Sequence, residues 1–460
     1  MAFGKAPSMK DSSDNILGDP KRAVLMMSLP IALALFLQYL NSVVDMFWVS
    51  GLGADAIAAV SIVTPLYSVI ISIGNGIGIG ASYAISKRIG AGNNDSASKA
   101  SSQSLAMTMI IGFVSIFILF IIAEPVMSYM GADNIMGLCK AYAYPLILTS
   151  PLLMAGGLLA GCLRGEGAAS KATIILAIAA ITNIILDPIL IFWAGYGITG
   201  AAYATVLSVI ISMIPAIYWY LVKKDVLIPI TFRNFRFTRK EVTSISKVGL
   251  PQTVELIFMS LMSVFFVRYI SFAGGTDLVA VFEVTWRIAL ILMVPAQAIG
   301  TAFVPILSAS FGMKDKDRVK ESFDYGLKVS IAIMLVMAVI TLLIAPYLAE
   351  LMTLSDDSVR LRSSIIEMLV VCTLFFPAFS LIFSSAALLQ SMGHGSLSLL
   401  ITIARNLAIA VAYASLSAYA IASYMWWGMT VVEVAFGFIG IVVAVCVFRK
   451  YKFNNQEFPS

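Results

Sequence analysis

Apolar residues run along this chain in stretches of roughly 20 or more, separated by short breaks that contain charged residues, Gly or Pro. A helix that crosses a hydrocarbon layer needs such a stretch, whereas the strands of a membrane barrel alternate polar and apolar side chains. The pattern here does not alternate. It predicts an all-α polytopic membrane protein whose twelve spans lie near 23–50, 58–88, 100–122, 138–162, 170–193, 198–222, 246–271, 279–310, 324–345, 364–390, 397–420 and 424–448.

Composition supports this class. Hydrophobic residues make up 60% of the 460 residues and charged residues only 12%, and the mean hydropathy is +0.94, far from a soluble globular chain. The polar regions are too short to form a separate soluble domain. The first span follows a polar stretch without a small-residue cleavage site, so we expect a retained helix and not a removed signal peptide.

The placement of the basic residues predicts the orientation. Of the 30 Lys and Arg residues, 23 fall in the termini and in alternate connections between spans, and four fall on the opposite side. By the positive-inside rule we expect both termini to be cytoplasmic, in a multi-pass protein of the cell membrane. Because the basic residues are interleaved with spans, we expect no nucleic-acid partner.

A weak internal duplication divides the chain. Leu29-Pro30 recurs 221 positions later as Leu250-Pro251, and LRGEG at 163–167 matches SMGHG at 391–395. Six spans repeated in one orientation predict two lobes with a cavity between them. The predicted divisions are a cytoplasmic tail (1–22), an N-lobe (23–222), a cytoplasmic linker lying at the lipid headgroups (223–247), a C-lobe (248–448) and a second cytoplasmic tail (449–460).

One span carries a carboxylate beyond a proline. Asp45 lies about 15 residues after Pro30, and an ionisable side chain inside a membrane is by default a functional candidate. The charged residues well inside the predicted spans are Asp45, Asp187, Glu255, Glu283, Arg287, Arg405 and Glu433.

Three polar residues of the N-lobe lie at one depth. Asp45, Asp187 and Thr205 each fall about six or seven residues from the outer end of a span, roughly 9 to 10 Å below the hydrocarbon surface. Asn183 precedes Asp187 by one helical turn and shares its face, and Pro188 frees a nearby carbonyl. These oxygens would suit Na⁺, and two close carboxylates could instead share a proton. Both alternatives stay open.

The C-lobe lacks this set. At the repeat offsets, Asp45 falls opposite Phe266, Asn183 opposite Val411 and Asp187 opposite Ser415. An acid site in only one lobe argues against a purely structural role, which both lobes would need.

The acids of the C-lobe have basic residues at hand. Glu283 and Arg287 are four apart on one helical face, so we expect them to pair. Arg405 and Glu433, on the last two spans, are a second expected pair. Glu255 lies near the end of the seventh span, and the sequence favours neither a structural nor a coupling role for it.

These residues resemble a known family. The pattern LP followed by VVDMFWVSGLGADAIAAVS, the glycine-rich second span and the segment TNIILDP resemble multidrug and toxic compound extrusion (MATE) transporters, in particular the DinF-like branch found in archaea and bacteria. The resemblance runs from about residue 20 to 450. It implies a first-lobe cation site formed by Asp45, Asn183, Asp187 and Thr205, and a hinge at Pro30.

The resemblance implies export of amphipathic, often cationic compounds in exchange for Na⁺ or H⁺, with no cofactor and no enzymatic activity. A cavity rich in Met and aromatic residues above a carboxylate suits such compounds. The residues we expect to line this cavity on the N-lobe are Gln38, Asn41, Tyr142 and Met154. We expect the protein to be a monomer within the lipid bilayer.

Three other functions compete with drug export. A flippase for lipids or lipid-linked oligosaccharides of the same superfamily is the main alternative, but it would be expected to hold basic residues in its cavity. A channel would need a pore-lining ring, and an intramembrane enzyme would need a catalytic constellation, for which one turn histidine, His394, offers little material.

Overall fold

The computed structural model describes residues 9–232, 235–353, 359–419 and 422–453, and its secondary structure is helical in the elements assigned there. The α-helices are α1 (Met9–Leu17), α2 (Pro20–Ser50), α3 (Ala54–Gly90), α4 (Asn94–Tyr129), α5 (Met136–Leu148), α6 (Ser150–Gly165), α7 (Ala169–Pro188), α8 (Gly197–Ile217), α9 (Arg239–Leu292), α10 (Val294–Gly312), α11 (Lys316–Met352), α12 (Arg362–Thr373), α13 (Phe376–Ser391), α14 (Gly395–Leu416) and α15 (Ala422–Lys450). Short helical turns are η1 (Asp133–Ile135), η2 (Ile189–Trp193), η3 (Tyr218–Lys223), η4 (Val359–Leu361) and η5 (Ser417–Tyr419).

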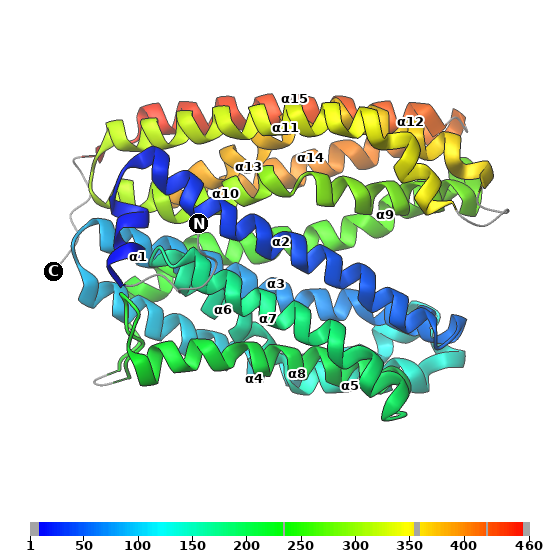
Figure 1. Ribbon diagram of the computed structural model, residues 1–460, viewed down its shortest axis with the longest axis horizontal. Helices are drawn as coiled ribbons and strands as arrows, with labels where there is room; N and C mark the ends of the chain where they lie inside the picture. Colours follow the sequence, from blue (N-terminus) through cyan, green and yellow to red (C-terminus); the bar gives the residue numbers. More distant parts are fainter. Residues whose placement is uncertain (1–8, 233–234, 354–358, 420–421, 454–460) are drawn as a thin grey trace.

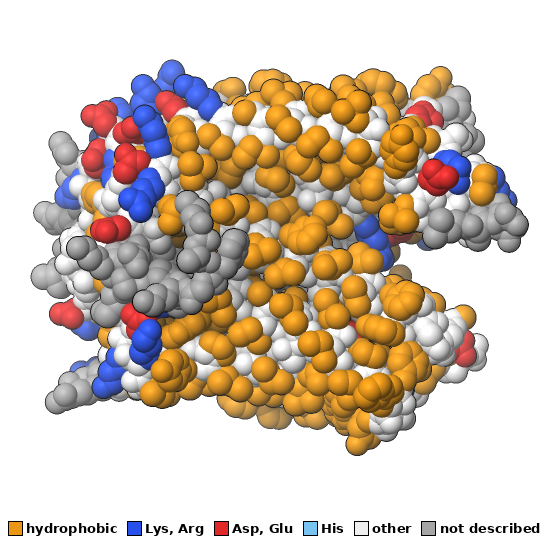
Figure 2. All heavy atoms as spheres, viewed as in Figure 1, with side chains coloured by type: hydrophobic (Ala, Val, Ile, Leu, Met, Phe, Trp, Pro, Cys, Tyr) orange, Lys and Arg blue, Asp and Glu red, His pale blue; other side chains and the backbone are white. Residues whose placement is uncertain are grey.

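The predicted membrane class is confirmed. Within the described residues, ten helices are long and apolar enough to span a membrane, or twelve if each of two sharply bent helix pairs counts as one span. The outer surface of these helices is covered by apolar side chains (Figure 2), and Phe117, Ile121 and Leu343 are each about 70% exposed. Such a large apolar surface needs lipid around it.

Three predicted spans are broken where a proline opens a new helix. The span near 138–162 bends by 55° between α5 and α6, and the span near 364–390 bends by 51° between α12 and α13. The predicted span 279–310 is also wrong as a single helix, because α9 ends at Leu292 and α10 begins at Val294. In each case a proline occupies the first or second position of the second helix, where its missing N–H costs nothing.

α9 contains two segments that the sequence predicts as separate spans. Its 54 residues are interrupted at Gly274 and Gly275, which have non-helical backbone angles. Gly275 has φ of +65°, a left-handed conformation that glycine adopts without a side-chain clash. The chain therefore turns back at this pair of glycines.

The helices form two groups on either side of a central layer (Figure 1). Helices α4, α5 and α8 lie in one group and α11 to α15 in the other, while α2, α3, α9 and α10 pack against one another between them. We keep the name N-lobe for α2 to α8 and C-lobe for α9 to α15.

Lys and Arg gather at one end of the molecule, which we call the basic face (Figure 2). At the opposite end a notch separates the two helix groups in the same view. The lobes are parted at that end, whereas near the basic face Gly90 of α3 lies against the backbone of Ala309 of α10.

The linker differs from the prediction of a chain lying at lipid headgroups. Its last part, from Arg239 to Lys247, belongs to α9, and Ile228 is only 1% exposed. The Ile228 N–H donates to Glu166 at 2.9 Å, and the Ser98 hydroxyl donates to the Pro229 carbonyl at 2.5 Å. Buried backbone groups need such partners, and the N-lobe supplies them.

The N-terminal segment is also more ordered than a predicted tail. Within it, α1 packs on α2 and α10 at the basic face. The Asn15 side chain donates to the Gly167 carbonyl at 3.1 Å in the N-lobe, and Arg318 of the C-lobe donates to the Ile16 carbonyl at 3.0 Å. This helix therefore touches both lobes.

Candidate cation site

The two N-lobe carboxylates come from α2 and α7, which pack side by side. α2 is one continuous helix of 31 residues that contains Pro30, and it begins at an N-cap, Asp19, whose side chain accepts the Arg22 N–H at 2.8 Å. α7 ends at Pro188 and passes into the π-helical turn η2. Because Pro188 has no N–H, the backbone carbonyl one turn before it lacks its usual helical donor.

Asp45 and Asp187 meet within the N-lobe. Their carboxyl groups lie close enough for each to influence the charge of the other, and the Asn183 amide donates to Asp187 Oδ1 at 3.1 Å. Asp187 is fully buried and Asn183 is 4% exposed. The structure thus brings Asp45, Asn183 and Asp187 together, and their role as a cation site stays a prediction.

The group has more acceptors than donors. Among the described residues, Asp45 Oδ1 and Asp187 Oδ2 are buried without a hydrogen-bond partner, and so is the side-chain oxygen of Asn41 one turn before Asp45. No Lys or Arg forms an ion pair with either carboxylate in the described part of the chain. Like charges this close require a proton or a cation between them.

Thr205 forms no hydrogen bond with Asp45, Asn183 or Asp187 among the described residues. It is half-buried on α8, and its hydroxyl donates to the Ala201 carbonyl at 3.1 Å. Because the hydroxyl proton points back along the helix, the oxygen lone pairs remain free to face a cation.

Two tyrosines lie close enough to Asp45 to interact with its charge, Tyr67 on α3 and Tyr142 on α5. Tyr67 was not among the predicted site residues, and no sequence spacing indicates it, because its proximity to Asp45 depends on how α3 packs. Tyr142 was selected as a residue of the drug cavity. It is 6% exposed and belongs to the apolar core of the N-lobe.

A cavity of about 530 Å³ lies among different residues from those predicted. Its wall comes mainly from the C-lobe, with aromatic residues, two methionines and several charged groups; among them are Phe266, Phe282, Trp286, Phe379, Phe383, Met259, Met429, Glu255, Glu283, Glu433 and Arg405. From the N-lobe it includes Tyr39, Ile79, Ser82 and Arg164. Tyr39 reaches across to the C-lobe and donates to Gln297 at 2.9 Å.

The predicted lining residues Gln38, Asn41, Tyr142 and Met154 do not line this cavity. Gln38 is exposed, and Met154 is completely buried. Met154 is buried because its helix packs closely against α3: a Cβ added at Gly74 would lie 2.7 Å from the Met154 Cα. A methionine at such a contact is packing material of the core.

Of the two ion pairs predicted in the C-lobe, one is confirmed and the other is wrong. Arg405 and Glu433 pair at 3.4 Å, and both are nearly buried. The predicted pair of Glu283 and Arg287 does not occur among the described ion pairs. Glu283 is half-buried in the cavity wall, whereas Arg287 is exposed on the flank of the helix.

Glu255 joins two helices of the C-lobe. One of its carboxylate oxygens accepts the Thr402 hydroxyl at 3.0 Å, and the other has no partner among the described residues. Its side chain faces the cavity. The residue therefore combines a structural contact with an available acceptor.

Comparisons with known proteins define the class. The chain matches the MatE family over residues 30–189 and 251–416, which is more than half of its length. This all-helical, multi-pass membrane protein therefore belongs to the MatE family, whose members are transporters and not enzymes.

Individual relatives are consistent with that assignment. The chain is 27% identical over 317 residues to the probable multidrug resistance protein YoeA of Bacillus subtilis (strain 168), which covers 66% of this chain and 68% of that protein. A solved structure described as the outward-facing conformation of a multidrug resistance MATE family transporter of the MOP superfamily is similar with a TM-score of 0.92 and 29% identity, covering 95% of this chain and 98% of that one.

A second solved structure belongs to a MOP superfamily transporter from Pyrococcus furiosus Vc1 (DSM3638), described as having a binding pocket of reverse polarity that suggests a different function. Its TM-score is 0.91 at 30% identity, with 96% of this chain and 99% of that chain covered. The shared fold therefore accommodates pockets of different charge.

Proposed function

We propose that this protein is a secondary active antiporter that exports amphipathic, cationic compounds in exchange for H⁺ or Na⁺. The observation that carries the proposal is the proximity of the half-buried Asp45 to the fully buried Asp187, neither of which forms an ion pair with a basic residue in the described part of the chain. Such a pair gains a proton or a cation far more readily than it holds two charges. The relatives described as multidrug proteins support drugs as the cargo.

The proposed ion site contains Asp45, Asn183, Asp187 and Thr205. They offer two carboxylates, an amide and a hydroxyl, all oxygen donors of the kind that Na⁺ prefers. The unpartnered oxygen of Asn41 is a further donor on the same helix as Asp45. The site belongs to the pattern of the DinF-like branch.

Coupling follows because the ion held by Asp45 and Asp187 sets the shape of the N-lobe, and that shape decides whether the cavity retains its cargo. An ion arriving from outside neutralises the Asp45 and Asp187 pair, the first span bends at Pro30, and the N-lobe contracts and expels the cargo. Release of the ion to the cytoplasm restores the charged pair. The basic face is the cytoplasmic side in this scheme, as the positive-inside rule predicts, and one chain in the cell membrane suffices as the working unit.

The cavity supports a cationic cargo. It contains three carboxylates and two guanidinium groups, and the Arg405 guanidinium is already paired with Glu433. Aromatic faces and methionines in the wall suit hydrophobic cations of varied shape. A lipid-pyrophosphate flippase would need the opposite balance of charge, so it is the weaker alternative.

The direct test is transport by Asp45→Asn in proteoliposomes. With a cationic dye as cargo, we expect the wild-type protein to export it when a proton or sodium gradient is applied, and the variant to lose at least about tenfold of the gradient-driven rate. Full gradient-driven export by Asp45→Asn would refute the proposal.

A second measurement identifies the ion. We expect Na⁺ to raise the melting temperature of the detergent-solubilised wild-type protein if sodium is the ligand, because a ligand that binds only the folded state stabilises it. Asp187→Asn should abolish that rise. A dependence on pH without any effect of Na⁺ would identify a shared proton.

A further inference from the structure

The closed contact between the lobes is built on glycines of α3 and α9. A Cβ added at Gly80 would lie 2.4 Å from the Ile245 carbonyl oxygen, and one added at Gly76 would lie 2.0 Å from the Thr253 hydroxyl. The two backbones therefore touch, and any side chain larger than hydrogen would push the lobes apart.

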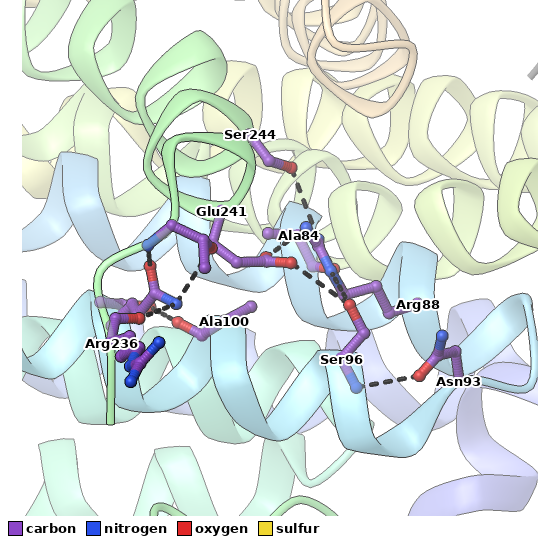
Figure 3. A network of polar contacts seen from close by, with 11 residues as sticks. Ala84, Arg88, Asn93, Ser96, Ala100, Arg236, Glu241 and Ser244 are labelled. Atoms are coloured by element: carbon purple, nitrogen blue, oxygen red, sulfur yellow. Dashed lines mark hydrogen bonds and ion pairs between the residues drawn. The ribbon is translucent and has the colours of Figure 1, made fainter. Parts of the chain in front are cut away.

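A buried ion pair lies at the end of this contact, near the basic face (Figure 3). Arg88 in the last turn of α3 pairs with Glu241 in the first turn of α9, and their exposures are 6% and 3%. Ser96 bridges the two, since Arg88 donates to its hydroxyl at 3.0 Å and that hydroxyl donates to Glu241 at 3.3 Å. Arg88 also donates to Ser244 of α9 at 3.4 Å.

The chemistry of this pair suits a contact that opens and closes. A buried pair contributes less net stability than an apolar contact of the same size, because both charges have lost their hydration. When the helices separate, both charges regain water, whereas an apolar surface would be newly exposed to it. The pair therefore stabilises the closed arrangement, and the free-energy cost of separating α3 from α9 stays small.

We propose that Arg88 and Glu241 form the latch that keeps the cavity closed at the basic face, and that the latch breaks each time the cavity opens there. The inference rests on the proposed antiport, in which the cavity must face both sides in turn. Removing one partner leaves the other charge buried and uncompensated, so it shifts the population toward the separated arrangement, in which that charge is hydrated.

Thr253 provides a probe for separation. It is 8% exposed, and its hydroxyl faces Gly76 across the α3 and α9 contact. In the full-length protein we would replace Thr253 by Cys and the exposed Cys446 by Ser; the other cysteines, at 139, 162 and 372, are buried. The rate at which a polar maleimide labels Thr253→Cys in detergent then reports how often the helices part.

We expect Glu241→Gln and Arg88→Gln each to raise the labelling rate at least about tenfold. The matched control is Glu321→Gln, which removes an exposed pair with Lys21 that also links the two lobes, at 3.4 Å. That pair is 47% to 55% exposed and should leave the rate unchanged. Exchanging the charges, Arg88→Glu with Glu241→Arg, should restore slow labelling.

Parental labelling rates in Glu241→Gln would overturn the latch, and so would acceleration that the charge exchange fails to reverse, because the pair would then serve folding alone. The melting temperature of each variant distinguishes opening from unfolding. The labelling rate does not depend on which ion drives transport. If Asp45→Asn kept full export and refuted the proposed coupling, the labelling experiment would still test the latch.

Discussion

The two lobes treat buried charge in opposite ways. The N-lobe places Asp45 near Asp187 without an ion pair to either among the described residues, while the C-lobe neutralises Glu433 with Arg405 at 3.4 Å. A pair of opposite charges is complete in itself, whereas a pair of like charges requires something from outside. The difference teaches that charge balance, more than burial, separates a structural pair from a binding site.

The repeat makes this contrast sharper. Phe266 lies opposite Asp45 in the duplication and packs its ring against Tyr413, with centroids 5.6 Å apart. Ser415, opposite Asp187, is exposed and donates to the carbonyl of Val411 in its own helix. The same architectural positions thus carry acidic residues of the proposed ion site in one lobe, and an aromatic cavity residue and an exposed serine in the other.

The equivalent turns 163–167 and 391–395, at the basic face, also differ between the lobes in whether they bury an ionisable side chain. Glu166 and His394 are equivalent in the duplication, yet Glu166 is 1% exposed and His394 is exposed. Burial raises the pKa of Glu166 to about 8, against the opposing effects of the Ile228 N–H and of Lys171. The N-lobe again keeps a carboxyl group where its charged form is disfavoured.

The largest expected effect comes from breaking the C-lobe pair. Arg405→Met leaves Glu433 buried and uncompensated, so we expect a loss of about 3 to 5 kcal/mol in the free energy of unfolding. Thermal unfolding in detergent, followed by tryptophan fluorescence, measures it. Replacing Glu433 by Met as well should recover most of the loss.

Removing one charge from the N-lobe pair should not lower the stability of the protein, in contrast to Arg405→Met. Asp45→Asn removes a repulsion and should leave the melting temperature unchanged or higher, although it abolishes coupling. A loss of stability in Asp45→Asn as large as that of Arg405→Met would contradict the distinction between the two lobes.

A smaller effect is expected from Glu166→Gln, measured against pH. Because the pKa of Glu166 is raised in the folded state, the folded protein keeps a proton that the unfolded chain releases above about pH 4.5. The free energy of unfolding should therefore fall as pH rises from about 4.5 to about 8, by about 2 to 4 kcal/mol.

Glu166→Gln should flatten that part of the profile, since the amide has no proton to lose and its oxygen can still accept the Ile228 N–H. Glu321→Gln, an exposed change at the same face, serves as the control. An unchanged pH profile in Glu166→Gln would assign the dependence to another group.

Much of this arrangement follows from the sequence. The spans are visible because hydrocarbon demands long apolar runs, and the meeting of Asp45, Asn183 and Asp187 follows from equal depth and helical spacing. Arg405 and Glu433 were predicted as a pair for similar reasons. Helical spacing and depth in the membrane can both be counted along the sequence.

Contacts between helices are not encoded in this way. Met154 could not be distinguished from a cavity residue, because its burial depends on the approach of α3 at Gly74. The Arg88 and Glu241 pair was equally invisible, since charges at helix ends are usually solvated. The break at Met293 had a local signal in Pro295, but it lies inside an uninterrupted apolar run.

The smallest expected effect also separates the two possible ions. A sodium ion uses oxygen lone pairs, and Thr205 offers them because its proton is donated to Ala201. Thr205→Val should therefore weaken Na⁺-dependent stabilisation by about 1 kcal/mol, or about fivefold in affinity. A proton shared by Asp45 and Asp187 needs no third ligand, so the same variant should leave proton-driven export intact. Titrating the melting temperature with Na⁺ and measuring export under a pH gradient, in the wild-type protein and in Thr205→Val, would assign the N-lobe site to one ion. If Na⁺ stabilises the wild-type protein and Thr205→Val keeps the full stabilisation, Thr205 is not a ligand of that ion.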